Sequence, residues 1–228
     1  MNILFKENCP YMLNAQKINR NKAFHIVKAN VESLRKSNQT IESIYKIIFQ
    51  HPNFEFLNIV SNRGVEVITY EQANLSINSF GHFFEETINR ESKYVGIYLD
   101  NSKEWIYSFF GLLKAGFTPV LFSTANPVEE IKIIGENLGI SYLITNKELN
   151  LDGFTLVNPF NISEKNSNER FDNEFGNEIV LLTSGTSGTP KIVFILEKNF
   201  VIKFITLKNY VRKIKTLPGH ISGSLDIL

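Results

Sequence analysis

The clearest chemistry in this sequence lies in a short segment of hydroxyls and glycines, residues 183–191. The segment directly follows the apolar stretch 178–182, which is typical of a buried strand. Glycines let a backbone approach a ligand, and successive N–H groups in such turns form concave anion sites. Five side-chain hydroxyls and the Lys191 ammonium add donors and charge, so the segment predicts a polyphosphate site. The predicted phosphate ligands are Thr183, Ser184, Gly185, Thr186, Ser187, Gly188, Thr189 and Lys191.

Two other interpretations of this segment fit less well. A flexible Ser/Gly linker has a similar composition, but linkers seldom follow an apolar strand and end in Pro–Lys. A P-loop needs a glycine directly before its lysine and Ser or Thr directly after it. Pro190 and Ile192 occupy these two positions. The P-loop, and with it an unrelated nucleotide-binding protein, therefore ranks third.

Composition bounds the class of protein. Of the 228 residues, 43% are hydrophobic and 12% aromatic, so the chain can bury a core. The net charge of +1 creates no strong field toward nucleic acid. A single cysteine, Cys9, excludes an internal disulfide framework. The apolar runs are too short to span a bilayer, and the start of the chain lacks the apolar centre of a signal peptide. We therefore expect a cytoplasmic protein without a membrane span or nucleic-acid partner.

The chain divides into two parts. Residues 1–39 form a polar N-terminal extension in which 23–34 fit a helix, and residues 40–228 form the main domain. A helix at 41–48 precedes a hairpin of strands 57–60 and 65–69. Strands are then expected at 94–99, 117–122, 141–145, 154–157, 178–182 and 192–196. Helices alternate with these strands up to residue 138, and another follows at 200–214. This alternation predicts an α/β fold with a mainly parallel sheet and helices on both faces.

Local signals place the helix starts. Thr69 is expected to cap a helix with Gln72 as its capping-box partner, while Asn101 and Asn126 are expected to cap the next two. His82 falls outside the apolar stripe of the first of these helices, which predicts a surface position. Pro119 lies within a predicted strand and favours an edge or bulged position.

The segment at 183–191 closely resembles the phosphate-binding signature of the adenylate-forming superfamily. This superfamily includes acyl- and aryl-CoA ligases, adenylation domains of nonribosomal peptide synthetases, and luciferases. Ile192 departs from the glycine that usually follows the lysine. Other segments resemble family motifs in the family order: 68–72, 95–104, 113–116, 126–127, 141–145 and 217–223.

The resemblance implies an incomplete N-terminal domain of an ATP-dependent ligase. Such enzymes activate a fatty, aryl or amino acid as an acyl-adenylate, release pyrophosphate, and usually pass the acyl group to a thiol. The implied cofactors are ATP and Mg²⁺, with the hydroxyl segment and Lys191 on the β- and γ-phosphates. The implied partners are the carboxylic acid and a thiol acceptor, either coenzyme A or carrier-protein pantetheine. His220 would belong to the substrate pocket.

The resemblance covers residues 40–228 and lacks several family motifs. No segment matches the adenine-site Tyr-Gly-x-Thr-Glu motif, and the ribose-binding Asp, the hinge and the lysine of the C-terminal domain are also missing. The resemblance implies that the Mg²⁺ ligand is a glutamate in the missing part. We therefore expect a fragment, a truncated product or one piece of a split protein whose C-terminal part is a separate chain. Such a chain would be inactive alone, and a non-catalytic remnant or interaction module is the alternative.

Overall fold

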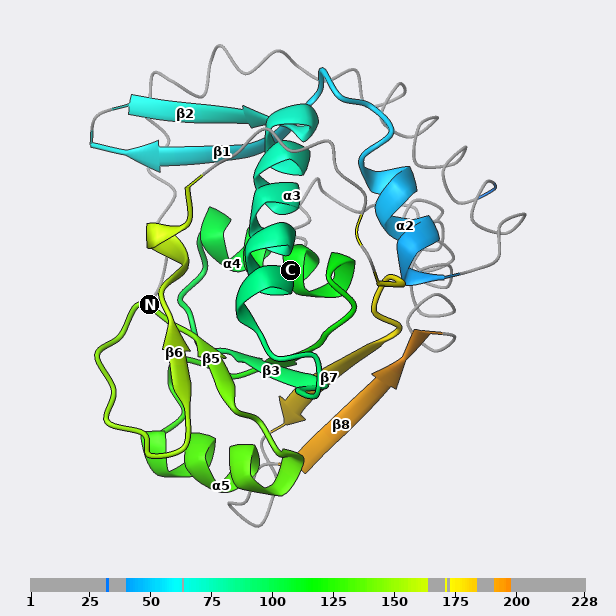
Figure 1. Cartoon of the computed structure of the whole chain (residues 1–228). Helices are drawn as coiled ribbons and strands as arrows, with labels where there is room; N and C mark the ends of the chain where they lie inside the picture. Colours follow the sequence, from blue (N-terminus) through cyan, green and yellow to red (C-terminus); the bar gives the residue numbers. More distant parts are fainter. Residues whose placement is uncertain are drawn as a thin grey trace, which may run out of the picture.

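The computed structural model describes residue 32 and residues 40–62, 64–163, 171, 173–183 and 191–197. Within these residues a six-stranded sheet carries helices on both faces, and a separate two-stranded hairpin lies above one of the helical layers (Figure 1). The predicted helices at 23–34 and 200–214 lie outside the described residues. None of the described helices is both long and apolar enough to cross a bilayer.

The elements follow the predicted order with small shifts at their ends. The helices are α2 (Ile41–Ile48), α3 (Tyr70–Thr87), α4 (Lys103–Lys114), α5 (Val128–Leu138) and the 3₁₀ turn η2 (Pro159–Asn161). The hairpin strands are β1 (Glu55–Ser61) and β2 (Gly64–Thr69). The sheet strands are β3 (Tyr94–Ile97), β4 (Thr118–Leu121), β5 (Tyr142–Ile144), β6 (Thr155–Val157), β7 (Glu178–Thr183) and β8 (Lys191–Leu196).

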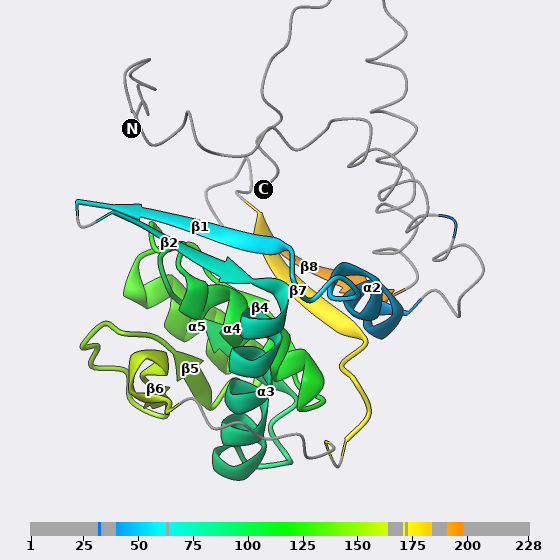
Figure 2. The same ribbon diagram turned by 90° about the horizontal axis from the view of Figure 1, so that it is seen from above.

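The sheet order is β6-β5-β3-β4-β7-β8. The first five strands are parallel, and β8 runs antiparallel to β7. Alternate side chains of the strands enter different cores, because successive residues of a strand point to opposite faces. Val95 and Ile97 pack with α3 and α4, whereas Val120 and Val180 pack with α5. Figure 1 shows α3 and α4 on one side of the sheet and α5 on the other, and the view from above shows α2 beside β7 and β8 (Figure 2). The predicted mainly parallel α/β fold with helices on both faces is confirmed.

The prediction that Pro119 marks an edge or bulge is wrong, since β4 lies between β3 and β7. Thr118 and Phe122 donate their N–H groups toward β3, to the carbonyls of Lys93 and Ile97. Backbone N–H groups of successive strand residues point to alternate neighbouring strands, so a residue next to Thr118 would donate toward β7. Pro119 stands at this position and lacks the N–H. The pairing of β4 with β7 begins only at Val120. An interior strand therefore accommodates this proline without losing a ladder hydrogen bond.

Two of the three predicted helix caps change. Thr69 and Gln72 form the predicted capping box of α3. The cap of α4 is Ser102 instead of Asn101, with its hydroxyl accepting from the Trp105 N–H at 3.1 Å. Asn126 does not cap α5, whose N-cap position is Pro127. Instead the Asn126 side chain closes the preceding turn by accepting from the Ser123 N–H at 2.9 Å.

His82 is not the surface residue that helical periodicity predicts. Its side chain is only 15% exposed, and its ring stacks on Phe171 with centroids 4.2 Å apart. Phe171 lies 89 positions further along the chain, so no local pattern could reveal the contact.

Candidate functional site

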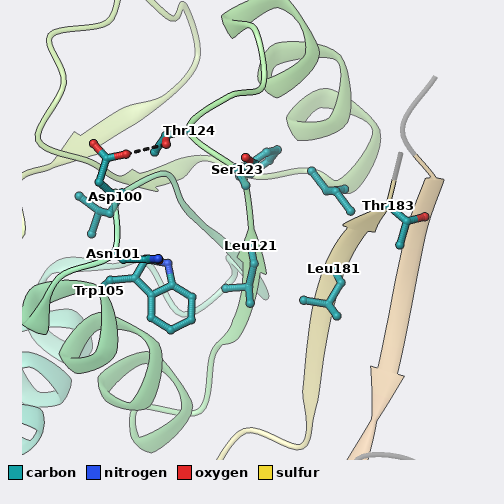
Figure 3. Close-up of a pocket in the computed structure, with 11 residues that line it drawn as sticks. Asp100, Asn101, Trp105, Leu121, Ser123, Thr124, Leu181 and Thr183 are labelled. Atoms are coloured by element: carbon teal, nitrogen blue, oxygen red, sulfur yellow. Dashed lines mark hydrogen bonds between the residues drawn. The ribbon is translucent and has the colours of Figure 1, made fainter. Parts of the chain in front are cut away.

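Three neighbouring strands end together at the carboxyl edge of the sheet. Leu121 of β4 is in register with Ile97 of β3 on one side and with Leu181 of β7 on the other. The residues that follow at this edge include Asp100 and Thr124, and β7 itself ends at Thr183. Figure 3 shows the side chains of Asp100, Leu121, Thr124, Leu181 and Thr183 around one pocket. Ligands of open parallel sheets bind beyond the carboxyl ends of the strands, so this edge is the candidate site.

A pocket of ≈ 450 Å³ occupies this edge. Its wall is about equally polar and apolar, with Trp105 from the first turn of α4 among the lining side chains. Its polar groups are a carboxylate, an amide and hydroxyls. The lining residues are Leu99, Asp100, Asn101, Trp105, Leu121, Phe122, Ser123, Thr124, Leu181, Leu182 and Thr183. A concave site in which apolar side chains and convergent polar groups meet can hold a small molecule.

Hydrogen bonds fix the turn after β4 on the end of β3. The Thr124 hydroxyl donates to Asp100 Oδ1 at 2.6 Å, as the dashed line in Figure 3 shows. The Tyr98 hydroxyl contacts the carbonyls of Thr124 and Asn126, at 3.2 and 3.1 Å. These bonds join the two strand ends that form one side of the pocket, so this side is held in place before any ligand binds.

The predicted phosphate segment begins and ends beside this pocket. Thr183 lines the pocket, is exposed, and pairs in register with Lys191, the first residue of β8. Both ends of the segment are thus strand residues rather than loop residues. Ser184, Gly185, Thr186, Ser187, Gly188 and Thr189 lie outside the described residues, as does His220. Their predicted roles, and those of Thr183 and Lys191, stay predictions.

The sequence did not single out the other pocket residues. Trp105 of α4 lines the pocket while its ring stacks on Phe109, with ring centroids 5.5 Å apart. The polar pairs Asp100–Asn101 and Ser123–Thr124 directly follow two apolar strands. That position, repeated after two parallel strands, is the signal that could have identified them.

Charged groups around the pocket are few. Lys103, in the first turn of α4, contacts Glu66 of β2 at 2.9 Å, and this hydrogen bond raises the pKa of the Lys103 ammonium. The pair ties the hairpin to the helix start next to the pocket. No group of three His, Cys, Asp or Glu side chains that could hold a metal ion exists in the part of the chain that the structure describes.

Comparisons with known proteins point to one family. Gramicidin S synthase 2 of Brevibacillus brevis is 27% identical over 143 residues, which cover 60% of this chain and 3% of the synthase. The chain therefore spans a small part of that relative.

Two solved structures from Klebsiella oxytoca share the fold. The NpsA N-terminal subdomain in complex with 3-hydroxyanthranilyl-AMSN has a TM-score of 0.56 at 20% identity, covering 69% of this chain and 40% of that one. The artificially fused adenylation–PCP di-domain NpsA-ThdA has a TM-score of 0.60 at 19% identity. The alignment covers 71% of this chain and 33% of the fused chain. At these identities the likeness shows the fold alone.

The model of the family described as AMP-binding enzyme matches residues 48–220. The matched residues include the hairpin, all six strands of the sheet and the predicted phosphate segment. The chain belongs to the AMP-binding enzyme family.

Proposed function

We propose that this chain supplies the triphosphate-binding part of an adenylate-forming ligase, which activates a carboxylic acid with ATP. One observation carries the proposal. The predicted polyphosphate segment joins two adjacent strands, with Thr183 paired to Lys191, beside the pocket at the carboxyl edge of the sheet. Membership of the AMP-binding family supports the same assignment.

In the proposed reaction a carboxylate oxygen attacks the α-phosphorus of ATP. The new O–P bond forms as the bond to the pyrophosphate leaving group breaks, which yields an acyl-adenylate and pyrophosphate. Lys191 and the hydroxyls and N–H groups of 183–189 would bind the β- and γ-phosphates. Their contribution would be placement of the triphosphate and stabilisation of the charge that develops on pyrophosphate.

The structure assigns no residue to Mg²⁺, because the described residues hold no suitable cluster. Mg²⁺ commonly binds through substrate phosphates and waters with one or two carboxylates. We therefore propose that the ion enters with the nucleotide, and that its protein ligand is the glutamate that the family resemblance implies and that this chain does not contain.

The comparisons favour a carrier-protein thiol as the acceptor over coenzyme A. The relative named above is a gramicidin synthase, and one structural neighbour is an adenylation domain fused to a PCP. Another is in complex with an aryl compound, 3-hydroxyanthranilyl-AMSN. We propose an amino or aryl acid as substrate, and a complete reaction that needs residues beyond those matched here.

Calorimetric titration of residues 1–228 with pyrophosphate and with MgATP tests the phosphate site. Lys191→Ala is expected to weaken both affinities roughly five- to tenfold, a modest loss because Lys191 is exposed. Gly188→Val should weaken them as well by restricting the backbone. Lys132→Ala, which removes an exposed lysine of α5, is the control and should bind like the unsubstituted chain. Equal affinity in all four proteins would contradict the assignment.

Carboxylate-dependent exchange of labelled pyrophosphate into ATP separates ligase from binding module. We expect no exchange by this chain alone, and exchange by a longer protein that contains it. Binding without exchange in both proteins would favour the alternative of a non-catalytic module.

A further inference from the structure

The residues immediately before β7 are fastened to the α3–α4 pair. We call residues 171–177 the strap. Its first residue, Phe171, lies parallel to the His82 ring, with centroids 4.2 Å apart and an interplanar angle of 4°. The ring occupies the space over Gly81, since a Cβ built there would lie 2.6 Å from Phe171 Cε1. Lys114 Nζ lies 5.7 Å from the same ring. Phe171 thus sits in a position shaped by three residues of two helices.

The rest of the strap follows the carboxyl end of α4. Asn173 Nδ2 donates to the Ala115 carbonyl at 3.0 Å. The Gly176 N–H donates to the Leu113 carbonyl at 2.6 Å. Gly116, with φ of 84°, brings the backbone so close that an added Cβ would lie 2.8 Å from Asn173 Cβ. The strap is therefore held at its start, middle and end.

The strap matters because only a short hydrogen-bonded ladder joins β7 to β4. The register of β4 with β7 comprises two residue pairs, Val120–Val180 and Leu121–Leu181. A ladder this short leaves the start of β7 to be fixed by other contacts. The strap ends one residue before Glu178, and the Glu178 carboxylate contacts Lys93 Nζ at 2.8 Å. From there β7 runs six residues, roughly 20 Å, to Thr183 at the pocket.

We propose that Phe171 is a positioning residue for the phosphate site. Seated on His82 and Gly81, it fixes the start of β7, and the strand carries this placement to Thr183. The inference rests on the proposed function, because it concerns the affinity of that site for phosphate. Its physical basis is the stacked aromatic pair, which contributes beyond the area it buries.

The imidazole of His82 presents its face to Phe171, while its Nδ1 lies 3.6 Å from Glu85 Oε2. Its Nε2 is buried and has no hydrogen-bond partner among the described residues. Replacement by phenylalanine should therefore keep the stack, whereas alanine removes it. This difference gives a matched pair of variants in which only the ring at position 82 changes.

The test combines hydrogen exchange with pyrophosphate titration of the 228-residue chain. The variants are Phe171→Ala, His82→Ala and Gly81→Ala, the last of which displaces the Phe171 ring without altering it. We expect faster exchange at the Gly176 amide and in β7, and a pyrophosphate affinity reduced roughly two- to tenfold. His82→Phe should match the unsubstituted chain in both measurements. Val157→Ala, a core truncation in β6 at the opposite edge of the sheet, should leave β7 exchange and affinity unchanged.

The outcomes separate the two proposals. Faster exchange in β7 with unchanged affinity in the strap variants would overturn the positioning role while leaving the phosphate site intact. Unaltered exchange in β7 would overturn the anchoring itself. If His82→Phe loses as much affinity as His82→Ala, stacking is not the cause and the inference fails. If Lys191→Ala binds pyrophosphate like the unsubstituted chain, the proposed function fails, and the positioning role fails with it.

Discussion

Lys114 illustrates at the residue scale how burial sets the charge of a side chain. Its ammonium donates to the amide oxygens of Asn78 and Asn74 and lies 4.5 Å from the centre of the Tyr45 ring. Aromatic faces and amide oxygens replace only part of the water that a lysine loses on folding. Burial therefore lowers the pKa of Lys114 to about 8.

This pKa predicts a specific dependence of stability on pH. The unfolded chain keeps Lys114 protonated up to about pH 10.5, whereas the folded protein releases the proton above about pH 8. Between these values the unfolded state binds more protons, so the free energy of unfolding should rise with pH, by at most about 3 kcal/mol. Below about pH 8 the gain is absent.

Urea unfolding at several pH values from 7 to 10 measures this effect. The rise in the free energy of unfolding should disappear in Lys114→Met. The difference in this free energy between the two proteins should therefore change between pH 8 and pH 10. Lys132→Met, at an exposed position, controls for the loss of one charge. Parallel pH profiles for all three proteins would show that Lys114 titrates at its ordinary value.

Ser108 gives a second prediction at this scale. Its side chain is fully buried in α4, and the hydroxyl has no hydrogen-bond partner among the described residues. A buried polar group without a partner is destabilising. Ser108→Ala should therefore leave the free energy of unfolding unchanged or raise it by about 1 kcal/mol, measured by urea unfolding. Destabilisation of the same size would reveal a partner for this hydroxyl.

At the scale of elements, α3 depends on the junction with β2. The Thr69 hydroxyl accepts from the Gln72 N–H at 3.2 Å, and the Gln72 side chain accepts from the Thr69 N–H at 2.9 Å. Thr69 is both the last residue of β2 and the N-cap of α3. The two hydrogen bonds of the capping box therefore fix the angle between the hairpin and the helix.

Thr69→Ala removes the side-chain acceptor of this capping box. The expected loss of stability is about 1 kcal/mol, measured by thermal or urea unfolding. Thr69→Ser keeps the hydroxyl and should retain most of the stability. A loss in the serine variant equal to that in alanine would mean that the methyl group, and not the cap, matters.

At the scale of the whole molecule, β8 is the last strand of the sheet in the described residues. Three of its side chains are substantially exposed: Val193 at 39%, Phe194 at 45% and Leu196 at 43%. An edge strand with apolar side chains is a template for association between molecules.

We therefore expect the 228-residue chain to self-associate at high concentration, as measured by light scattering. Phe194→Lys should lower the apparent mass, because a charge on an edge strand opposes pairing. Val60→Lys adds a lysine at a side chain of the separate hairpin that is 71% exposed. It is the control and should leave the apparent mass unchanged. A chain that is monomeric at all concentrations would contradict this prediction.

Much of the local structure could be predicted because its causes are local. The capping box at Thr69 and Gln72 and the left-handed Gly139 that ends α5 involve residues that are close in sequence. The alternation of strands and helices predicted a parallel sheet. The hydroxyl segment after an apolar strand predicted a phosphate site, which stays a prediction, and the two ends of that segment, Thr183 and Lys191, lie at the carboxyl edge of the sheet.

Only the tertiary structure decided which distant residues meet. The order of the strands brings the ends of β3, β4 and β7 into one pocket, although they are up to about eighty residues apart. The same order places Pro119 in the interior of the sheet, where its parity makes it harmless, and puts Phe171 over His82. Periodicity along a chain reports which face of an element is buried. It carries no information about which other element covers that face, because that choice depends on how all the elements pack together.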